Sequence, residues 1–178
     1  MKVAICEYGA GNVRSVRVAF ARLGVEETAD VLGADLAVLP GVGAARAAME
    51  GLRARGHDEE LRQRFAAQKP ILGICLGLQL ALDETEEDGG VAGLGLVPGR
   101  SVRLQEGRIP RIGWAPVCGG DAFYFAHSYA AETEHATAFS EGVVAEVRYG
   151  SFLGCQFHPE KSGEAGTRYL EEQCLSLA

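Results

Sequence analysis

The stretch KPILGICLGLQLAL, residues 69–82, is the part of the sequence that decides the fold. Its first apolar run, ILGI (71–74), is typical of a buried strand, and the residues after Cys75 favour a buried helix. Gly73 and Gly77 stand two positions to either side of this cysteine, where any side chain would crowd a sharp turn from strand to helix. We therefore predict a tight turn that presents the Cys75 thiol at the edge of a sheet.

Short apolar runs alternate with helical patterns through the first half of the chain. VAIC (3–6) and LAVL (36–39) are typical of buried strands, and a helical pattern follows each of them. This alternation predicts a parallel sheet covered by helices on both faces. The helix after the first strand would bury Val13, Val16, Phe20 and Leu23, and a further helix is predicted around residues 57–68.

The second half is richer in strand patterns, which indicates an antiparallel portion added to the sheet. The predicted fold class is therefore α/β, with an open, largely parallel mixed sheet, helices on both faces and a terminal helix within residues 165–176. No change in composition marks a linker, so we expect a single domain over residues 1–178. The strand patterns of this half lie within residues 95–104, 121–129, 143–149 and 152–157.

The composition narrows the class of protein. With a net charge of −7 over 178 residues, the chain lacks the basic surface expected for binding nucleic acid or an anionic membrane. No apolar run approaches the roughly 20 residues of a membrane-spanning helix, and the N-terminal run is too short for a secretory signal. The five cysteines are an odd number without a CxxC pair, which favours a reducing cytoplasm over a disulfide framework or a zinc site. We expect a cytoplasmic protein without a metal or cofactor.

A base for the Cys75 thiol lies near the C-terminus, in QFHPEK (156–161). Pro159 disfavours a helical conformation at His158, and in an extended segment His158 and Glu160 would point to the same side. A carboxylate beside an imidazole orients the ring and stabilises its charged form, so these two residues and Cys75 form a candidate triad. The simpler interpretation is a packing cysteine and a strand-end histidine beside a solvated glutamate.

Acyl transfer also needs hydrogen-bond donors for the oxyanion. By the geometry of the predicted turn, the amide of Leu76 is one candidate donor. PGVG (40–43) ends the strand at 36–39 and would reach the same sheet edge, where its glycines let the Val42 amide approach a substrate or flip. From the tetrapeptide alone, a simple tight turn is the favoured alternative.

Taken together, GICLGLQ, PGVG and FHPEKS resemble the class I, triad-type glutamine amidotransferases. Within that class, EYGAGNVRS, IGW, YFAHSY and HPEKS are similar to the glutaminase subunits of imidazole glycerol phosphate synthase, from histidine biosynthesis. These motifs cover nearly the whole chain in the order of the family. Ile112, where the family usually has Met, Ala126, where Val is more usual, and a short segment between Trp114 and Tyr124 depart from the pattern.

The resemblance implies that Cys75 attacks the side-chain amide of glutamine and forms a γ-glutamyl thioester. His158, oriented by Glu160, would protonate the departing ammonia and then activate water. The resemblance also supplies residues for binding glutamine, which would otherwise be interpreted as solvated polar positions. They are the side chains of Gln79 and Glu87 and the backbone of Ser128 and Tyr129.

The same resemblance implies a partner, a (β/α)-barrel cyclase subunit to which the ammonia would travel. That subunit consumes a phosphoribulosyl-formimino aminoimidazole carboxamide ribonucleotide and releases imidazole glycerol phosphate and the carboxamide ribotide. Trp114 is the only tryptophan of the chain, and a buried core position is the alternative to an interface anchor. The implied interface residues are Asn12, Trp114, Tyr124 and Lys161.

Gly41 and Gly43 flank Val42, which suggests a peptide with two orientations. One would aim the Val42 amide at the oxyanion, and the other would turn it away. With the resemblance, this predicts a poor resting site that the partner improves, and an isolated chain with an aligned triad and the Val42 amide turned away.

Three rival interpretations remain open at this stage. The first is a glutaminase subunit of another amidotransferase. A stand-alone cysteine hydrolase on the same fold would need a broad substrate cleft and no partner. A thiol-based redox or regulatory protein would use Cys75 as a sensor, but it would leave Gln79, the HPE sequence and PGVG unexplained.

Overall fold

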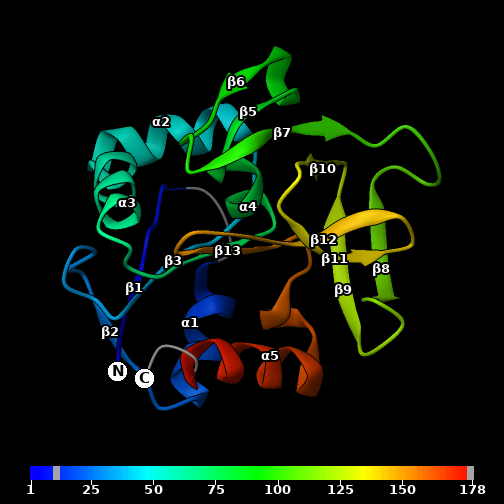
Figure 1. Ribbon diagram of the computed structural model, residues 1–178. Helices are drawn as coiled ribbons and strands as arrows, with labels where there is room; N and C mark the ends of the chain where they lie inside the picture. Colours follow the sequence, from blue (N-terminus) through cyan, green and yellow to red (C-terminus); the bar gives the residue numbers. More distant parts are fainter. Residues whose placement is uncertain (10–12, 176–178) are drawn as a thin grey trace.

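The chain folds around a seven-stranded sheet (Figure 1). The computed structural model describes residues 1–9 and 13–175. Strands β2, β1, β3, β4 and β13 run parallel, and β12 and β11 are antiparallel at one edge. The predicted fold class is thus confirmed. In sheet order the strands are β11 (Ala136–Ser140), β12 (Val143–Tyr149), β13 (Phe152–Cys155), β4 (Ile71–Ile74), β3 (Leu36–Leu39), β1 (Lys2–Ile5) and β2 (Glu26–Thr28).

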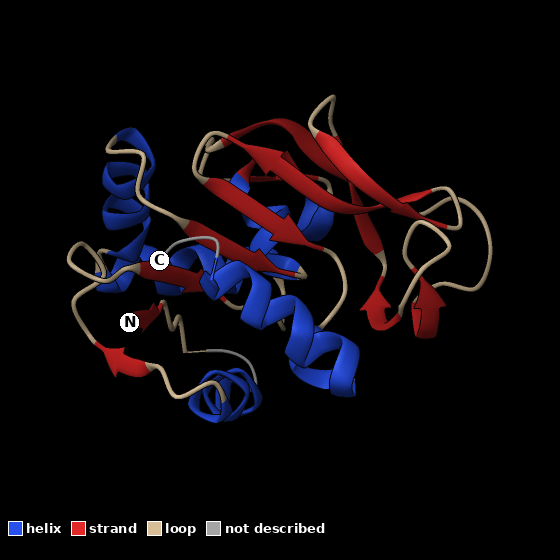
Figure 2. Ribbon diagram, turned by 60° about the horizontal axis from the view of Figure 1, so that its bottom comes forward, coloured by secondary structure: helices blue, strands red, loops and turns tan. Residues whose placement is uncertain are grey.

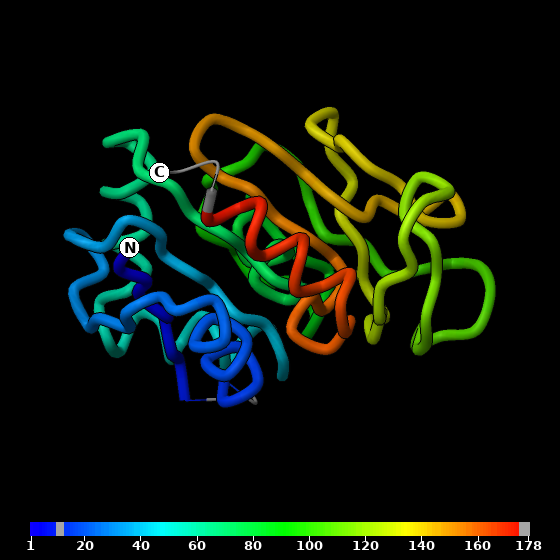
Figure 3. The backbone as a smooth tube through the Cα atoms, turned by 90° about the horizontal axis from the view of Figure 1, so that it is seen from below, coloured from blue at the N-terminus to red at the C-terminus, as the bar shows by residue number. Residues whose placement is uncertain are grey.

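Helices cover both faces of this sheet, as the alternation predicts. Helices α1 (Val13–Arg22) and α5 (Gly163–Leu175) lie on one face (Figure 2), and they are in front when the molecule is seen from below (Figure 3). The other face carries α2 (Ala45–Arg55), α3 (His57–Ala66) and α4 (Leu76–Ala81). Two hydrophobic cores result, one on each side of the sheet.

A second sheet and a hairpin complete the chain, and the sequence analysis did not predict them as separate units. The second sheet has the order β10-β7-β5-β6, and the hairpin pairs β8 with β9. Two short 3₁₀ turns, η1 and η2, follow β5 and β13. The bounds are β5 (Leu82–Thr85), η1 (Glu87–Gly89), β6 (Val91–Ala92), β7 (Val97–Arg103), β8 (Arg111–Pro116), β9 (Ala122–His127), β10 (Tyr129–Glu132) and η2 (Pro159–Lys161).

Helix α2 is the helix that the sequence analysis missed. Its buried face uses the small side chains of Ala45 and Ala48 together with Met49 and Leu52. Alanine contributes little to a hydrophobic pattern, so the helical period of this segment is weak in the sequence. By contrast, the predicted strands at 36–39, 71–74 and 143–149 coincide with β3, β4 and β12.

The parallel register brings four chain segments to one edge of the sheet. Ile5 pairs with Val38, Leu39 with Gly73, and Cys155 with Ile74. Because these strands are parallel, the residues that follow their carboxyl ends emerge side by side. The segments concerned are Cys6–Tyr8, Pro40–Gly43, Cys75 and its helix, and Gln156–His158.

Arg64 on α3 is a fully buried cation. Its guanidinium donates hydrogen bonds to the carbonyl oxygens of Val31 (2.6 Å), Ala34 (2.9 Å) and Pro70 (2.9 Å). Burial lowers the pKa of this group from its ordinary value, and nearby negative groups oppose that shift. The side chain therefore fastens the loop before β3 to the start of β4.

Replacing this cation should destabilise the fold. Arg64→Met keeps much of the buried volume but leaves several carbonyl oxygens without a donor, so we expect a loss of roughly 3 kcal/mol in the free energy of unfolding. Arg53→Met, at an exposed position of α2, is the matched control and should stay within about 0.5 kcal/mol of the wild type. Chemical denaturation measures both, and equal stability of the two variants would contradict this account of Arg64.

Candidate active site

The nucleophile candidate sits on a strained turn between β4 and α4. Cys75 has φ 52° and ψ −106°, a positive φ that residues other than glycine rarely adopt. Its N–H donates to the carbonyl oxygen of Cys155, the last residue of β13, at 2.7 Å, which continues the pairing of β4 with β13 by one residue beyond the end of β4. A Cβ on Gly77 would overlap the Leu39 carbonyl, so the helix can approach β3 this closely only with glycine at that position.

The thiol is nearly buried and contacts a glutamine that the sequence analysis did not single out. Gln156 is completely buried, and its Nε2 donates to the Cys75 Sγ at 3.5 Å. The Oε1 of the same amide accepts a hydrogen bond from the Nε2 of Gln79 at 3.1 Å. Gln156 lies two residues before His158 in QFHPEK, so only the i, i+2 spacing could have indicated that it faces the site.

His158 and Glu160 lie side by side, but not for the reason the sequence suggested. The Nδ1 of His158 is 2.9 Å from Glu160 Oε1, and both side chains are almost fully buried. His158 itself is extended, whereas Pro159–Lys161 form the 3₁₀ turn η2. The prediction of an extended segment through Glu160 is therefore wrong, because the proline begins a turn instead.

The charge state of His158 follows from its two neighbours. Burial alone would lower its pKa, but hydrogen bonds and charge interactions with Cys75 and Glu160 more than offset that effect and raise it from 6.5 to about 9. With Nδ1–H donating to Glu160, the Nε2 of the ring is left to face the thiol. This arrangement can move a proton between sulfur and ring.

The two candidate oxyanion donors, the amides of Leu76 and Val42, differ in their hydrogen bonding. Leu76 begins α4, so its N–H has no acceptor within that helix. The Val42 N–H instead donates to the Tyr8 hydroxyl at 3.1 Å. Between them, Gly41 is wedged into the turn at Cys75, since a Cβ there would overlap the Ile74 carbonyl oxygen and the Leu76 nitrogen.

A cavity of about 380 Å³ opens beside the thiol. The side chain of Gln79 reaches the Tyr129 carbonyl oxygen at 2.8 Å through its Nε2. The Glu87 carboxylate accepts a hydrogen bond from the Ala45 N–H at 3.1 Å, and burial raises its pKa while this bond opposes the shift. The residues of the cavity wall include every predicted catalytic, oxyanion and glutamine-binding residue except Glu160, namely Val42, Cys75, Leu76, Gln79, Glu87, Ser128, Tyr129 and His158.

A second histidine lines the same cavity, and the sequence analysis did not assign it a role. The Nδ1 of His127 is 2.8 Å from the Tyr129 carbonyl oxygen. Among the described residues its Nε2 has no hydrogen-bond partner. Burial lowers the pKa of this ring to about 4; its bond to Tyr129 opposes the shift, and the charges of Arg111 and His158 add to it. His127 is therefore a neutral ring in the same cavity as His158, whose pKa is shifted in the opposite direction.

The predicted interface residues Trp114 and Tyr124 lie on the hairpin formed by β8 and β9. Trp114 is 58% exposed, so a core position is excluded, and Ile112 beside it is 61% exposed. The rings of Trp114 and Tyr124 meet edge to face at 6.2 Å, and Tyr124 also neighbours the His158 ring at 6.5 Å. Lys161 is exposed and lines the cavity. The fourth predicted residue, Asn12, lies outside the described residues.

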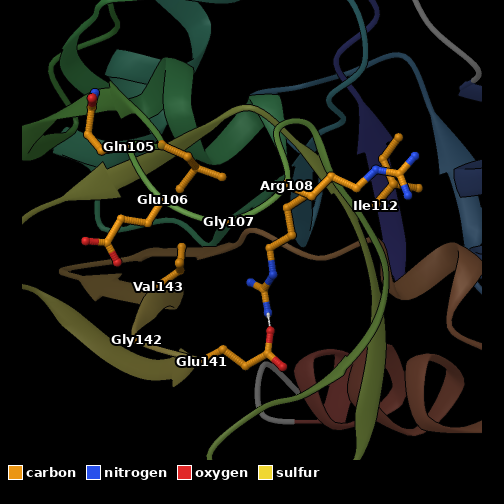
Figure 4. Close-up of a pocket in the computed structure, with 10 residues that line it drawn as sticks. Gln105, Glu106, Gly107, Arg108, Ile112, Glu141, Gly142 and Val143 are labelled. Carbon is orange, nitrogen blue, oxygen red and sulfur yellow. Dashed lines mark hydrogen bonds and ion pairs between the residues drawn. The ribbon is translucent and has the colours of Figure 1, made fainter.

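A larger hollow of about 690 Å³ lies along β8 and the segment before it (Figure 4). Arg111 donates to Glu141 across it at 2.9 Å and stacks on the Phe125 ring at 4.3 Å. Its walls contain none of the triad residues, so the smaller cavity is the candidate active site.

Neither a metal centre nor a membrane span is found in the part of the chain that the structure covers. Over residues 1–9 and 13–175, no three His, Cys, Asp or Glu side chains are grouped so that they could hold a metal ion. Within the same ranges, no helix has both the length and the apolar character to cross a membrane.

Comparisons with known proteins identify the family and the fold of this chain. The family profile described as "Glutamine amidotransferase class-I" matches residues 5–177. A solved structure described as that of a glutamine amidotransferase superposes with a TM-score of 0.79 at 21% identity, covering 98% of this chain and 97% of the other. The structure of PurLQS from Thermotoga maritima gives a TM-score of 0.76 at 19% identity, and at such identities these likenesses concern the fold alone. Profile, fold and site together define an enzyme of the class I glutamine amidotransferase type.

Curated relatives show to which family of class I glutamine amidotransferases the chain belongs. The imidazole glycerol phosphate synthase subunit HisH of Symbiobacterium thermophilum is 44% identical over 193 residues, covering 95% of this chain and 91% of the relative. The HisH of Methanothermobacter thermautotrophicus is 41% identical and covers 94% of this chain and 95% of its own. A chloroplastic hisHF protein of Arabidopsis thaliana is 39% identical, and the match takes up only 33% of that longer protein. The chain belongs to the HisH family, the glutaminase subunits of imidazole glycerol phosphate synthase in histidine biosynthesis.

The raised pKa of His158 provides a test of the contact between ring and thiol. Since it lies above the ordinary 6.5, protonation of His158 stabilises the fold below pH 6.5, and this contribution is lost as the pH rises through about 9. Cys75→Ala removes an interaction that raises this pKa, so we expect the pKa of His158 to fall in that variant. An NMR titration of the ring protons measures it.

Cys118→Ala is the control for this titration, because it removes an exposed thiol and should leave the His158 titration where it is in the wild type. An unchanged His158 pKa in the Cys75→Ala variant would show that ring and thiol do not interact in solution.

Proposed function

We propose that the chain hydrolyses glutamine through Cys75, His158 and Glu160 and delivers the ammonia to a cyclase partner. The observation that carries this proposal is the strained turn at Cys75, which faces a buried His158–Glu160 pair whose Nδ1 and Oε1 are 2.9 Å apart. The arrangement has the three roles of a nucleophile, a base and a group that orients the base. We infer that residues 1–178 act as a single amidotransferase domain.

In the first half of the reaction, the Cys75 sulfur attacks the side-chain carbonyl carbon of glutamine. His158 takes up the thiol proton, stabilised by Glu160, and returns a proton to the nitrogen as the carbon–nitrogen bond breaks. Ammonia leaves, and a γ-glutamyl thioester remains on Cys75. In the second half, His158 removes a proton from water, which attacks the thioester and releases glutamate and the free thiol.

The negative oxygen of each tetrahedral intermediate requires donors. The Leu76 amide is available at the start of α4, and the Val42 amide would join it after turning from Tyr8. Gln79, Glu87 and the backbone of Ser128 and Tyr129 line the cavity where the glutamine would lie. A half-buried carboxylate at Glu87 suits the α-amino group of the substrate.

The proposal of a cyclase partner is supported by exposed aromatic residues on the β8–β9 hairpin and by the family of the chain. Trp114 and Tyr124 pack edge to face on the β8–β9 hairpin, Lys161 lines the cavity, and a large exposed tryptophan is typical of an interface anchor. The Arabidopsis relative named hisHF is longer than this chain, which fits a glutaminase joined to a second function. We infer a heterodimer with a (β/α)-barrel cyclase in the cytoplasm.

A resting site that lacks one oxyanion donor would limit wasteful release of ammonia. Loss of one such donor costs a factor of ~10²–10³ in kcat. A peptide at Gly41–Val42 whose orientation the partner biases could therefore couple the two subunits without moving the triad. We infer that the isolated chain binds glutamine but hydrolyses it slowly, and that the partner with its ligand raises kcat far more than it lowers KM.

The nucleophile can be tested directly. Cys75→Ser should abolish glutaminase activity of the complex while fold and partner binding persist, because a serine hydroxyl at this position is a far weaker nucleophile. Cys118→Ser is the matched control and should retain turnover. Ammonia release measures both, and more than about a tenth of wild-type turnover in Cys75→Ser would refute the assignment.

Substitution of the base should reduce kcat more than substitution of the residue that orients it. His158→Ala should lose several orders of magnitude in kcat, because the proton acceptor and donor disappear together. Glu160→Gln should cost less, since the imidazole stays in place but is poorly oriented. Steady-state kinetics of the complex compare them, and a larger loss in the glutamate variant would reverse the roles proposed here.

A further inference from the structure

Tyr8 is a buried residue that touches the oxyanion segment. It follows β1 by three positions and is 3% exposed. Its hydroxyl oxygen lies 3.1 Å from the Val42 nitrogen, 3.0 Å from the Pro40 carbonyl oxygen and 3.2 Å from the Val42 carbonyl oxygen. One side chain from the end of β1 thus contacts both ends of the segment that follows β3.

The directions of these hydrogen bonds are fixed by chemistry. A hydroxyl has one proton and two lone pairs, so the Tyr8 oxygen accepts from the Val42 N–H and donates its proton to the Pro40 or Val42 carbonyl. Burial raises the pKa of Tyr8 to about 12, although its hydrogen bond with Val42 opposes the shift. The group therefore remains a hydroxyl at any working pH.

The strands that carry this contact, β1 and β3, are paired with each other close to it. The Cys6 N–H donates to the Val38 carbonyl at 2.8 Å, which extends the pairing of β1 with β3 toward Tyr8. Gly41 is wedged against the turn at Cys75, and Gly43 has φ +115°. A turn of the peptide between Gly41 and Val42 changes ψ of Gly41 and φ of Val42, and it leaves the paired strands that carry the segment in place.

We propose that the Tyr8 hydroxyl is the latch that keeps the Val42 amide turned away from the nucleophile in the resting enzyme. The inference rests on the proposed role of Val42 as an oxyanion donor. One N–H cannot serve the hydroxyl and the oxyanion together, so activation has to break this hydrogen bond. Tyr8 is absent from the wall of the substrate cavity, which makes it a positioning residue.

The move of the Val42 N–H from the Tyr8 hydroxyl to the oxyanion becomes more favourable as negative charge develops on that oxygen. A hydrogen bond to a charged oxygen is about twice as strong as one to a neutral hydroxyl, so the developing oxyanion competes with Tyr8 for the Val42 amide. Without the hydroxyl, the resting orientation would leave a half-buried N–H unpaired, and that orientation would be less populated. Removing the latch should therefore activate the isolated chain.

The test compares Tyr8→Phe with the wild type, alone and with the cyclase subunit. The isolated variant should hydrolyse glutamine with a kcat roughly three- to tenfold higher and an unchanged KM, the range expected for the loss of one ordinary hydrogen bond. In the complex its kcat should equal that of the wild type, so stimulation by the partner falls by the same factor. Tyr169→Phe is the matched control. It removes another hydroxyl hydrogen bond, to Glu146 at 2.8 Å, and should leave both kcat values unchanged.

The outcomes separate the latch from the proposed function. An isolated Tyr8→Phe variant with a kcat equal to or below that of the wild type, while the complex still hydrolyses glutamine, overturns the latch alone. A wild-type complex that releases no ammonia from glutamine overturns the proposed function together with the latch. Hydrogen exchange of the wild-type Val42 amide keeps the test independent of how the variant folds. Protection in the isolated chain supports the latch, and exchange at the rate of an exposed loop amide contradicts it.

Discussion

The hydrogen bond from the Cys75 amide to the Cys155 carbonyl, at 2.7 Å, is the contact on which the site depends. It extends the pairing of β4 with the last residue of β13 past the end of β4, so the turn that carries the thiol and the segment that leads to His158 leave the sheet in a fixed relation. The positive φ of Cys75 is tolerated because this bond and the close packing of Gly77 hold the turn from both sides. Sheet register thereby sets the distance between nucleophile and base.

Two histidines in one cavity illustrate how partners, rather than burial, decide charge. Burial lowers the pKa of both rings, yet His158 has a carboxylate at 2.9 Å and a thiol nearby and reaches about 9. His127 bonds only to a carbonyl, faces the charges of Arg111 and His158, and falls to about 4. The cavity therefore holds one ring that takes up a proton readily and one that does not, which confines its proton chemistry to His158.

The sequence predicts the parts of the site that depend on local spacing. Glycines two residues from Cys75 indicate a sharp turn, and His158 and Glu160 are close enough in the chain to meet. Contacts between distant segments leave no such pattern: Gln156 on the thiol, Tyr8 on Val42 and the buried guanidinium of Arg64 all depend on tertiary packing. The second sheet is missed for the same reason, because its strands come from separate parts of the chain and three of them have no more than four residues.

The close packing of Gly41 limits the conformational changes by which this site can be regulated. Because a Cβ at Gly41 would overlap the backbone of the turn at Cys75, the segment after β3 lies directly against that turn and has little room to shift. Two states that differ by one rotated peptide plane would have the same α-carbon trace and would superimpose as ribbons. The two states would differ in the direction of one amide dipole. Isotope-edited vibrational spectroscopy of the Gly41 carbonyl detects that difference, whereas a comparison of molecular shapes does not.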